Sequence, residues 1–159
     1  MFLSVLHWAP MKKISKAKVF DMEMLFRALA DRTRLRLLNL MGSDEVCVCY
    51  FVEVIRVPQP KISRHLAYLR KARIVGARRD GKWMHYRITE PTDPRAAKVF
   101  NEVRGWLLHD PAMQRERTRL VQMCCAKLPS HLERAPKPLP AKTEEVSRIP
   151  ALLNVNCPN

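Results

Sequence analysis

"PKISRHLAYLRKARIVGARRDGKWMHYRI", residues 60–88, is the stretch that decides the fold of this chain of 159 residues. In its first half Ile62, Leu66 and Leu69 recur at the spacing of one helix face, which predicts a helix that buries that face. In its second half the pattern changes to two short strands around Asp80-Gly81. This dipeptide favours a two-residue hairpin turn, because such turns need positive φ. The stretch therefore predicts a helix followed directly by a β-hairpin.

Helical patterns surround this stretch on both sides. We expect these further helices over residues 19–31, 32–41, 45–55, 93–110 and 112–128. Asp31 can cap the second helix, Gly42 can end it, and Ser43 or Asp44 can cap the third. The Asp110-Pro111 pair predicts either a kinked continuation or a new sixth helix. The order predicts a mostly α-helical fold with a small β-hairpin, which is a winged helix-turn-helix.

Positive charge is concentrated in the same stretch. The chain has 29 Lys and Arg against 15 Asp and Glu, a formal net charge of +14. Between Lys61 and Arg87 there are nine basic residues and one acidic residue, Asp80. The excess of positive charge in this segment is more than half of the net charge of the chain. On an exposed helix face and a hairpin tip, such an excess indicates double-stranded DNA as the partner. An enzyme is not expected, because four scattered glycines cannot form a phosphate-binding loop and no catalytic motif is present.

The expected DNA contacts divide between base edges and phosphates. The first turns of a recognition helix reach base edges in the major groove, and here they carry Gln59, Lys61, Ser63, Arg64 and His65. Further contacts, mostly to phosphates, are expected of Tyr68, Lys71, Arg78, Arg79 and Lys82. We expect Trp83 and Tyr86 to pack the hairpin onto the helices rather than to stack on bases. His65 and His85 have no ligand-like neighbours in the sequence, so neither is expected to bind a metal.

The two ends of the chain differ from its centre. We expect residues 1–16 to be a mobile N-terminal extension, residues 17–128 to form the winged-helix domain, and residues 129–159 to be a proline-rich tail. The first ten residues lack the charged leading region of a signal peptide, and no run of about 18 apolar residues could span a membrane. We therefore expect a cytoplasmic protein without a membrane partner, whose five cysteines are reduced.

Four motifs together closely resemble the ArsR/SmtB family of winged-helix metalloregulatory repressors: "ALADRTRLRLLNLM", "EVCVCYF", "PQPKISRHLAYLRKARIV" and "RRDGKWMHYRI". The likeness covers about residues 20–90. The resemblance implies a homodimer, built from the first helix and the helices after Asp93, that binds a palindromic operator and leaves it when a toxic metal ion binds. It implies an effector and no permanent cofactor. Within the family, "VCVC" resembles the branch that responds to arsenic and antimony, and also branches for cadmium and lead.

Cys47 and Cys49 are the candidate ligands in this motif. On an ideal helix they would stand about 200° apart, so one ion bound to both would unwind or tilt the start of the third helix. That movement would reach the recognition helix packed behind it. Thiolates are favoured near a helix N-terminus and a cationic surface, and they prefer soft ions. The alternative is that both residues are small buried core residues.

A complete local site of three sulfurs is missing, because Val52 stands where the arsenic-responsive pattern of the family has a third cysteine. Cys124-Cys125 offers two arrangements. In one, either residue, from the same or the partner subunit, completes the site of Cys47 and Cys49. In the other, Cys124 and Cys125 form their own dithiol site for arsenite or a monomethylated arsenical.

The sequence thus favours a transcriptional repressor that trivalent arsenic releases from DNA, as arsenite, antimonite or methylarsenite. Two alternatives keep the same fold: a thiol-redox or reactive-sulfur sensor, and a cadmium or lead sensor. A further alternative is an architectural DNA-binding protein whose cysteines are inert.

Overall fold

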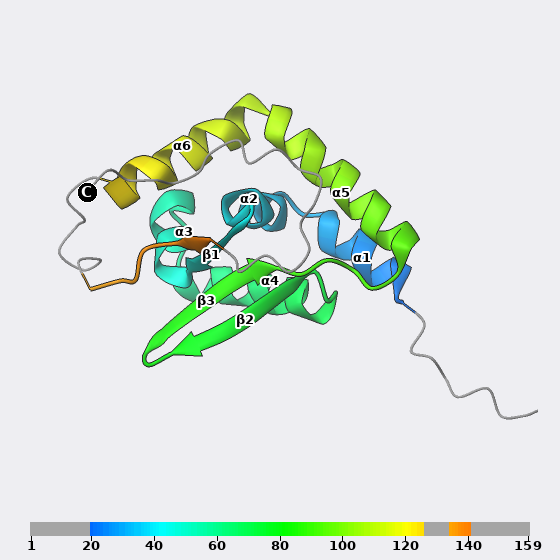
Figure 1. The fold of residues 1–159 in the computed structure, drawn as a ribbon, viewed down its shortest axis with the longest axis horizontal. Coiled ribbons are helices and arrows are strands. Elements are labelled where there is room, and N and C mark those ends of the chain that lie inside the picture. The colour runs from blue at the N-terminus through cyan, green and yellow to red at the C-terminus, as the bar shows by residue number, and fades with distance from the viewer. Residues whose placement is uncertain (1–19, 126–133, 141–159) are drawn as a thin grey trace, which may run out of the picture.

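The computed structural model describes residues 20–125 and 134–140. The expected N-terminal extension and most of the expected tail lie outside the described residues, so the domain limits stay predictions. The elements follow in the order α1 (Met22–Leu29), α2 (Arg32–Met41), β1 (Asp44–Cys47), α3 (Val48–Ile55), α4 (Gln59–Lys71), β2 (Val75–Asp80), β3 (Trp83–Ile88), α5 (Pro94–His109), α6 (Pro111–Cys125) and β4 (Leu139–Pro140). Helices α5 and α6 form an arch along one side of the molecule, and the β2–β3 hairpin projects from the opposite side (Figure 1). The predicted winged helix-turn-helix fold is confirmed.

Aspartate side chains at the helix starts accept hydrogen bonds from backbone amides, and the predicted cap at Asp31 is confirmed. Asp21 accepts a hydrogen bond from the Met24 amide of α1 at 2.8 Å, and Asp31 accepts one from the Arg34 amide of α2 at 2.9 Å. Such caps each stabilise a helix by about 1 kcal/mol. Helix α2 ends at Gly42, whose φ of 52° lies in the left-handed region that glycine tolerates.

The predicted buried face of α4 is confirmed. Ile62, Leu66 and Leu69 are fully buried and belong to the core that α1, α2, α3 and α5 also line. Burying one such side chain stabilises the fold by about 1.5–3 kcal/mol. Because this face is fixed against the core, the opposite face of α4 is turned outward.

The segment before α3 is the main departure from the predicted secondary structure. The prediction that residues 45–55 form one helix capped by Ser43 or Asp44 is wrong, because β1 precedes a shorter α3. Strand β1 pairs with β3, with Cys47 opposite His85, and its other edge pairs with β4 in a sheet of order β2-β3-β1-β4. Strand β3 would otherwise leave backbone N–H and C=O groups unpaired along its edge. This tertiary pairing outweighs the local helical pattern.

The hairpin forms where it was predicted, with its turn moved by one residue. Its register makes Gly81 and Lys82 the turn residues instead of Asp80 and Gly81, and Gly81 has the positive φ, 55°, that the turn needs. Tyr86 is buried, and its ring centroid lies 6.4 Å from that of Phe51 in α3. The hairpin is therefore packed onto the helices through Tyr86, as expected.

Helix α6 begins at its own cap. The Asp110 carboxylate accepts hydrogen bonds from the amides of Ala112, at 2.7 Å, and Met113, at 3.1 Å. It is therefore a separate sixth helix and not a kinked continuation of α5. Across residues 20–125 and 134–140 no helix is long and apolar enough to cross a membrane.

Candidate DNA-binding surface and cysteine site

The first turns of α4 carry the side chains predicted to reach base edges. Exposed or half-exposed on this surface are Gln59, Lys61, Ser63 and Arg64. His65 is placed differently, because its side chain is half-buried and its Nδ1 lies 3.4 Å from the Asp31 carboxylate that caps α2. Burial lowers the pKa of His65, although Asp31 opposes this shift. His65 thus has a partner inside the protein that the sequence did not indicate.

Two other predicted DNA contacts also have partners within the protein. The Arg34 guanidinium lies 4.4 Å from the centre of the Tyr68 ring. Arg78 donates to Glu45 Oε1 from Nε at 2.8 Å and from Nη2 at 2.5 Å, and its Nη1 lies 3.2 Å from Asp80. Glu45 is buried, and a buried carboxylate is costly unless a cation pairs with it. The charge of Arg78 is therefore largely compensated inside the fold.

The remaining basic side chains form an open surface between α4 and the hairpin. Exposed there are Lys71, Arg79 and Lys82. A shallow hollow between α4 and β2 adds two basic residues, because Arg70 and Arg73 line it beside the small residues Ala67, Gly76 and Ala77. The sequence interpretation missed this hollow. Small residues beside a cluster of arginines could have indicated it.

Cys47 and Cys49 lie next to each other at the N-terminal end of α3. Cys47 is fully buried and Cys49 is half-buried, and both are free thiols. The Cys49 thiol donates a hydrogen bond to Cys47 Sγ over 2.8 Å. The predicted separation of about 200° is wrong, because Cys47 precedes the helix with extended backbone angles, φ −68° and ψ 142°. One ligand can therefore reach both sulfurs without unwinding α3.

The two thiols differ in acidity because they share one proton. The hydrogen bond from Cys49 and, to a smaller extent, the backbone N–H groups of Cys49, Met84 and Val48 together lower the pKa of Cys47 to about 7, against the effect of burial. The same hydrogen bond and burial raise the pKa of Cys49. Above about pH 7 the pair therefore holds mostly a thiolate at Cys47 and a thiol at Cys49, a combination suited to soft ions or to oxidation.

Cys124, near the C-terminal end of α6, lies in the core and close enough to Tyr50 in the first turn of α3 to act on it electrostatically. It is 2% exposed, and burial raises its pKa to about 11, while nearby Lys137 acts in the opposite direction. The Cys125 side chain lies outside what the structure describes. Within residues 20–125 and 134–140 no three His, Cys, Asp or Glu side chains are grouped so that they could hold a metal ion. The described part of one chain therefore contains a prearranged pair of sulfurs and no preassembled trio.

Tyr50 is a functional candidate that the sequence interpretation missed. Its side chain is fully buried, and its hydroxyl has no hydrogen-bond partner among the described residues. Burial raises its pKa, and so do the negative charges that Cys124, Cys49 and Cys47 can carry, in that order. Tyr50 thus lies close to all three cysteines, and its unpaired hydroxyl is a buried polar group that calls for a partner.

Comparison with known proteins identifies the family. A family model described as "Bacterial regulatory protein, arsR family" matches residues 31–76, which run from α2 to the start of β2. The arsenical resistance operon repressor of Escherichia coli K12 is 38% identical over 103 residues, which are 64% of this chain and 86% of that protein. The chain belongs to the ArsR family of bacterial regulatory proteins.

Two further proteins are similar to this chain. The arsenic resistance transcriptional regulator ArsR1 of Pseudomonas putida KT2440 is 47% identical over 92 residues, 55% of this chain and 72% of that protein. A crystal structure of AntR, an antimony-specific transcriptional repressor, is 30% identical, covers 72% of this chain and 99% of that chain, and has a TM-score of 0.45. The relatives from Escherichia coli and Pseudomonas putida are transcription regulators and not enzymes. The ArsR-family chain described here is therefore a DNA-binding transcriptional repressor.

Proposed function

We propose that this ArsR-family repressor leaves its operator when trivalent arsenic binds the thiol groups of Cys47 and Cys49. Arsenite, antimonite and methylarsenite are the expected effectors. The observation that carries the proposal is the hydrogen-bonded pair of sulfurs, 2.8 Å apart, at the start of the helix that packs against α4. The arsenical resistance repressors among its relatives point to the same chemistry.

The state of the two thiols suits this reaction. Each arsenic–sulfur bond replaces a hydroxyl group of arsenite. The Cys49 proton leaves with one hydroxyl as water, and the Cys47 thiolate displaces the second hydroxyl, which takes a proton from solvent. Soft ions prefer thiolates. Thiolate metal sites can supply about 10–16 kcal/mol, whereas switching a repressor from bound to released needs about 5.5 kcal/mol of differential affinity.

A third ligand supplies the movement in this proposal. Because the two sulfurs are already adjacent, their binding alone does not need to distort α3. Trivalent arsenic can take one more sulfur, and Cys124 of α6 lies close enough to the buried Tyr50 hydroxyl to raise its pKa. We expect α6 to move toward α3 when Cys124 completes the site. The arrangement in which Cys124 and Cys125 bind arsenic separately is the alternative.

The DNA contacts are proposed on the open basic surface. Base edges would be read by Gln59, Lys61, Ser63 and Arg64, and phosphates would be held by Lys71, Arg79 and Lys82. His65, Tyr68 and Arg78 would act mainly through their internal partners, which hold α4 and the hairpin in place. The hollow beside Arg70 and Arg73 offers one more phosphate position.

A homodimer is proposed to bring two such surfaces onto a palindromic operator. Two large apolar side chains remain exposed on the helices expected to form the interface: Phe26 of α1 is 53% exposed and Trp106 of α5 is 71% exposed. Exposed aromatic side chains are enriched in the centres of protein interfaces. Sedimentation of the wild type and of a Trp106→Lys variant tests this, because the variant is expected to be monomeric at concentrations where the wild type is dimeric.

The effector is tested by release from DNA. A labelled duplex, selected from a random-sequence library by the wild-type protein, is bound and then titrated anaerobically with arsenite, antimonite, methylarsenite, cadmium and zinc. Release by the trivalent ions at lower concentration than by cadmium or zinc supports the proposal. A Cys124→Ser variant that keeps the pair at α3 distinguishes a shared site, which it weakens, from a site at Cys47 and Cys49 alone. No release by any trivalent ion would refute the proposal.

Oxidation of the same pair is the second candidate function. The short distance between Cys47 and Cys49 and the lowered pKa of Cys47 also favour attack on a peroxide or a persulfide. Mass spectrometry after mild oxidant measures the expected loss of two hydrogens within the peptide that carries both residues. DNA release that accompanies this loss, without any response to arsenite, would favour the redox function.

A further inference from the structure

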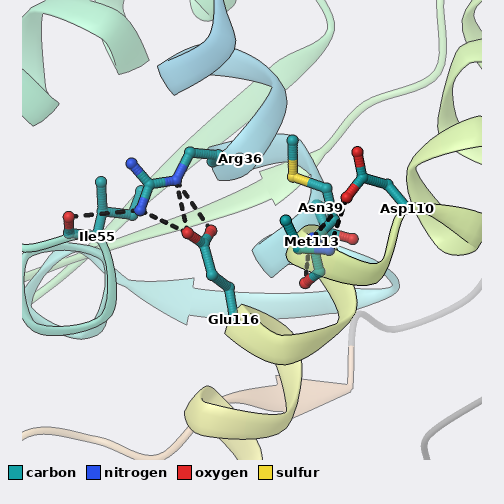
Figure 2. Close-up of polar contacts among 7 residues, drawn as sticks. Arg36, Asn39, Ile55, Asp110, Met113 and Glu116 are labelled. Atoms are coloured by element: carbon teal, nitrogen blue, oxygen red, sulfur yellow. Dashed lines mark hydrogen bonds and ion pairs between the residues drawn. The ribbon is translucent and has the colours of Figure 1, made fainter.

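An ion pair joins two helices that are far apart in the sequence. Arg36 of α2 donates from Nε to both carboxylate oxygens of Glu116 of α6, at 2.8 and 3.0 Å, and its Nη2 lies 2.5 Å from Oε1 (Figure 2). Both side chains are mostly buried, 22% and 18% exposed. Such two-pronged pairs fix orientation as well as distance, because a planar guanidinium matches a carboxylate in one geometry.

Arg36 also reaches the end of α3. Its Nη2 donates to the Ile55 carbonyl at 3.4 Å (Figure 2). Ile55 is the last residue of α3, and the next residue, Arg56, takes left-handed backbone angles that end the helix before α4 begins. Arg36 therefore lies between α6 and the turn that leads into the recognition helix.

Arg117, the residue after Glu116 in α6, contacts the chain at the start of the segment that contains Cys47 and Cys49. Arg117 is 6% exposed and donates to the Asn39 carbonyl at 2.9 Å and the Leu40 carbonyl at 3.3 Å, at the end of α2. It also lies 3.4 Å from the carboxylate of Asp44, the first residue of β1. Consecutive residues of α6 thus contact the start of β1 and, through Arg36, the end of α3. The segment between these two points contains both Cys47 and Cys49.

We propose that the Glu116–Arg36 pair is the positioning link through which a movement of α6 reaches the recognition helix α4. This inference rests on the proposed function, because it needs an effector at the cysteines. Cys124 lies two turns after Glu116 on the same helix, so drawing Cys124 toward α3 moves the Glu116 carboxylate with it. Because the carboxylate holds Arg36 by three contacts, Arg36 shifts with it, and its bond to the Ile55 carbonyl transmits the shift to the end of α3. The turn before α4 is then displaced.

The test separates coupling from stability and from DNA affinity. Glu116→Gln keeps the shape of the side chain and removes its charge. We expect its DNA affinity without effector to stay within about threefold of the wild type, while the weakening caused by arsenite falls about tenfold, a usual size for coupling between two sites. Glu102→Gln, at an exposed position of α5, is the matched control and should behave as the wild type. Mass spectrometry checks that each variant still binds arsenite in the same ratio.

Two further variants keep the inference falsifiable. If Glu116→Gln does not fold, Arg36→Lys retains the charge and loses the two-pronged geometry, so it should also reduce the response to arsenite. Exchanging the two charges, Arg36→Glu with Glu116→Arg, should restore part of the response, which a merely structural role would not do. A wild type that ignores arsenite refutes the proposed function itself. A wild type that responds, with a Glu116→Gln or Arg36→Lys variant that responds equally, overturns only this inference.

Discussion

Replacing Cys49 by alanine removes the thiol that donates to Cys47 Sγ over 2.8 Å. This hydrogen bond is the largest of the causes that lower the pKa of Cys47 from its ordinary value of 9.0 to about 7. The substitution leaves the backbone N–H groups near Cys47 in place, so part of the shift remains. We expect the pKa of Cys47 to rise by about one unit or more. At pH 7 its thiolate fraction then falls from about one half to below about one tenth, because each unit is a factor of ten.

Ultraviolet absorbance of the thiolate measures this directly in anaerobic protein. Subtracting the titration of a Cys47→Ala variant removes the contribution of the other cysteines. The sign of the effect also predicts the response to arsenite. Because the pKa of Cys47 is lowered, its thiolate is present above about pH 7 and is lost as the pH falls below that value. Release by arsenite should weaken over the same range. An identical titration midpoint in the wild type and in Cys49→Ala would refute the shared proton.

Three further outcomes test the DNA surface and the core. Lys82→Gln should reduce the slope of log affinity against log salt by about 1, because one phosphate contact releases about one cation. Fluorescence anisotropy over a salt series measures this slope. Arg119→Gln, at an exposed position of α6, is the control that should leave the slope unchanged. Leu66→Ala should lower the free energy of unfolding by about 2–5 kcal/mol, because Leu66 is fully buried. Urea denaturation that finds no change would contradict the placement of Leu66 in the core. Gly42→Ala should destabilise the folded protein by about 1 kcal/mol or more, because φ at this position is 52° and an added Cβ would overlap the Arg117 side chain. An unchanged melting temperature would show that this turn is not constrained.

The recognition helix and the hairpin could be predicted because their signals are local. Ile62, Leu66 and Leu69 mark one helix face by spacing alone, and the structure buries all three. A glycine beside a charged residue between two short strands marks the turn, and Gly81 has the expected positive φ. Each of these patterns depends on residues a few positions apart, so neighbouring sequence is enough to predict them.

The cysteine site could be predicted in position but not in geometry. Residues 44–47 become a strand because β3 lies beside them, and β3 is about forty residues away in the sequence. Since Cys47 belongs to that strand, the angle expected on an ideal helix does not apply. The partners of Tyr68 and Arg78 depend in the same way on elements that only the fold brings together.

The polar link to α6 was also out of reach of sequence reasoning. Arg36 and Glu116 are 80 residues apart, and neither carries a motif that distinguishes it from an ordinary surface charge. Arg117 is an ordinary basic residue in the sequence and a nearly buried one in the fold. Only the packing of α6 against α2 and α3 reveals what these three charges do.

The affinity of a Cys47→Ser, Cys49→Ser double variant for operator DNA tests the central claim most directly. It is measured by anisotropy beside the wild type, with and without arsenite, in reduced anaerobic protein. Without arsenite the two proteins should bind the duplex equally well. With arsenite the wild type should bind at least about 100-fold more weakly, while the variant does not change. A variant that arsenite releases as readily as the wild type would contradict the claim that these two sulfurs control DNA binding.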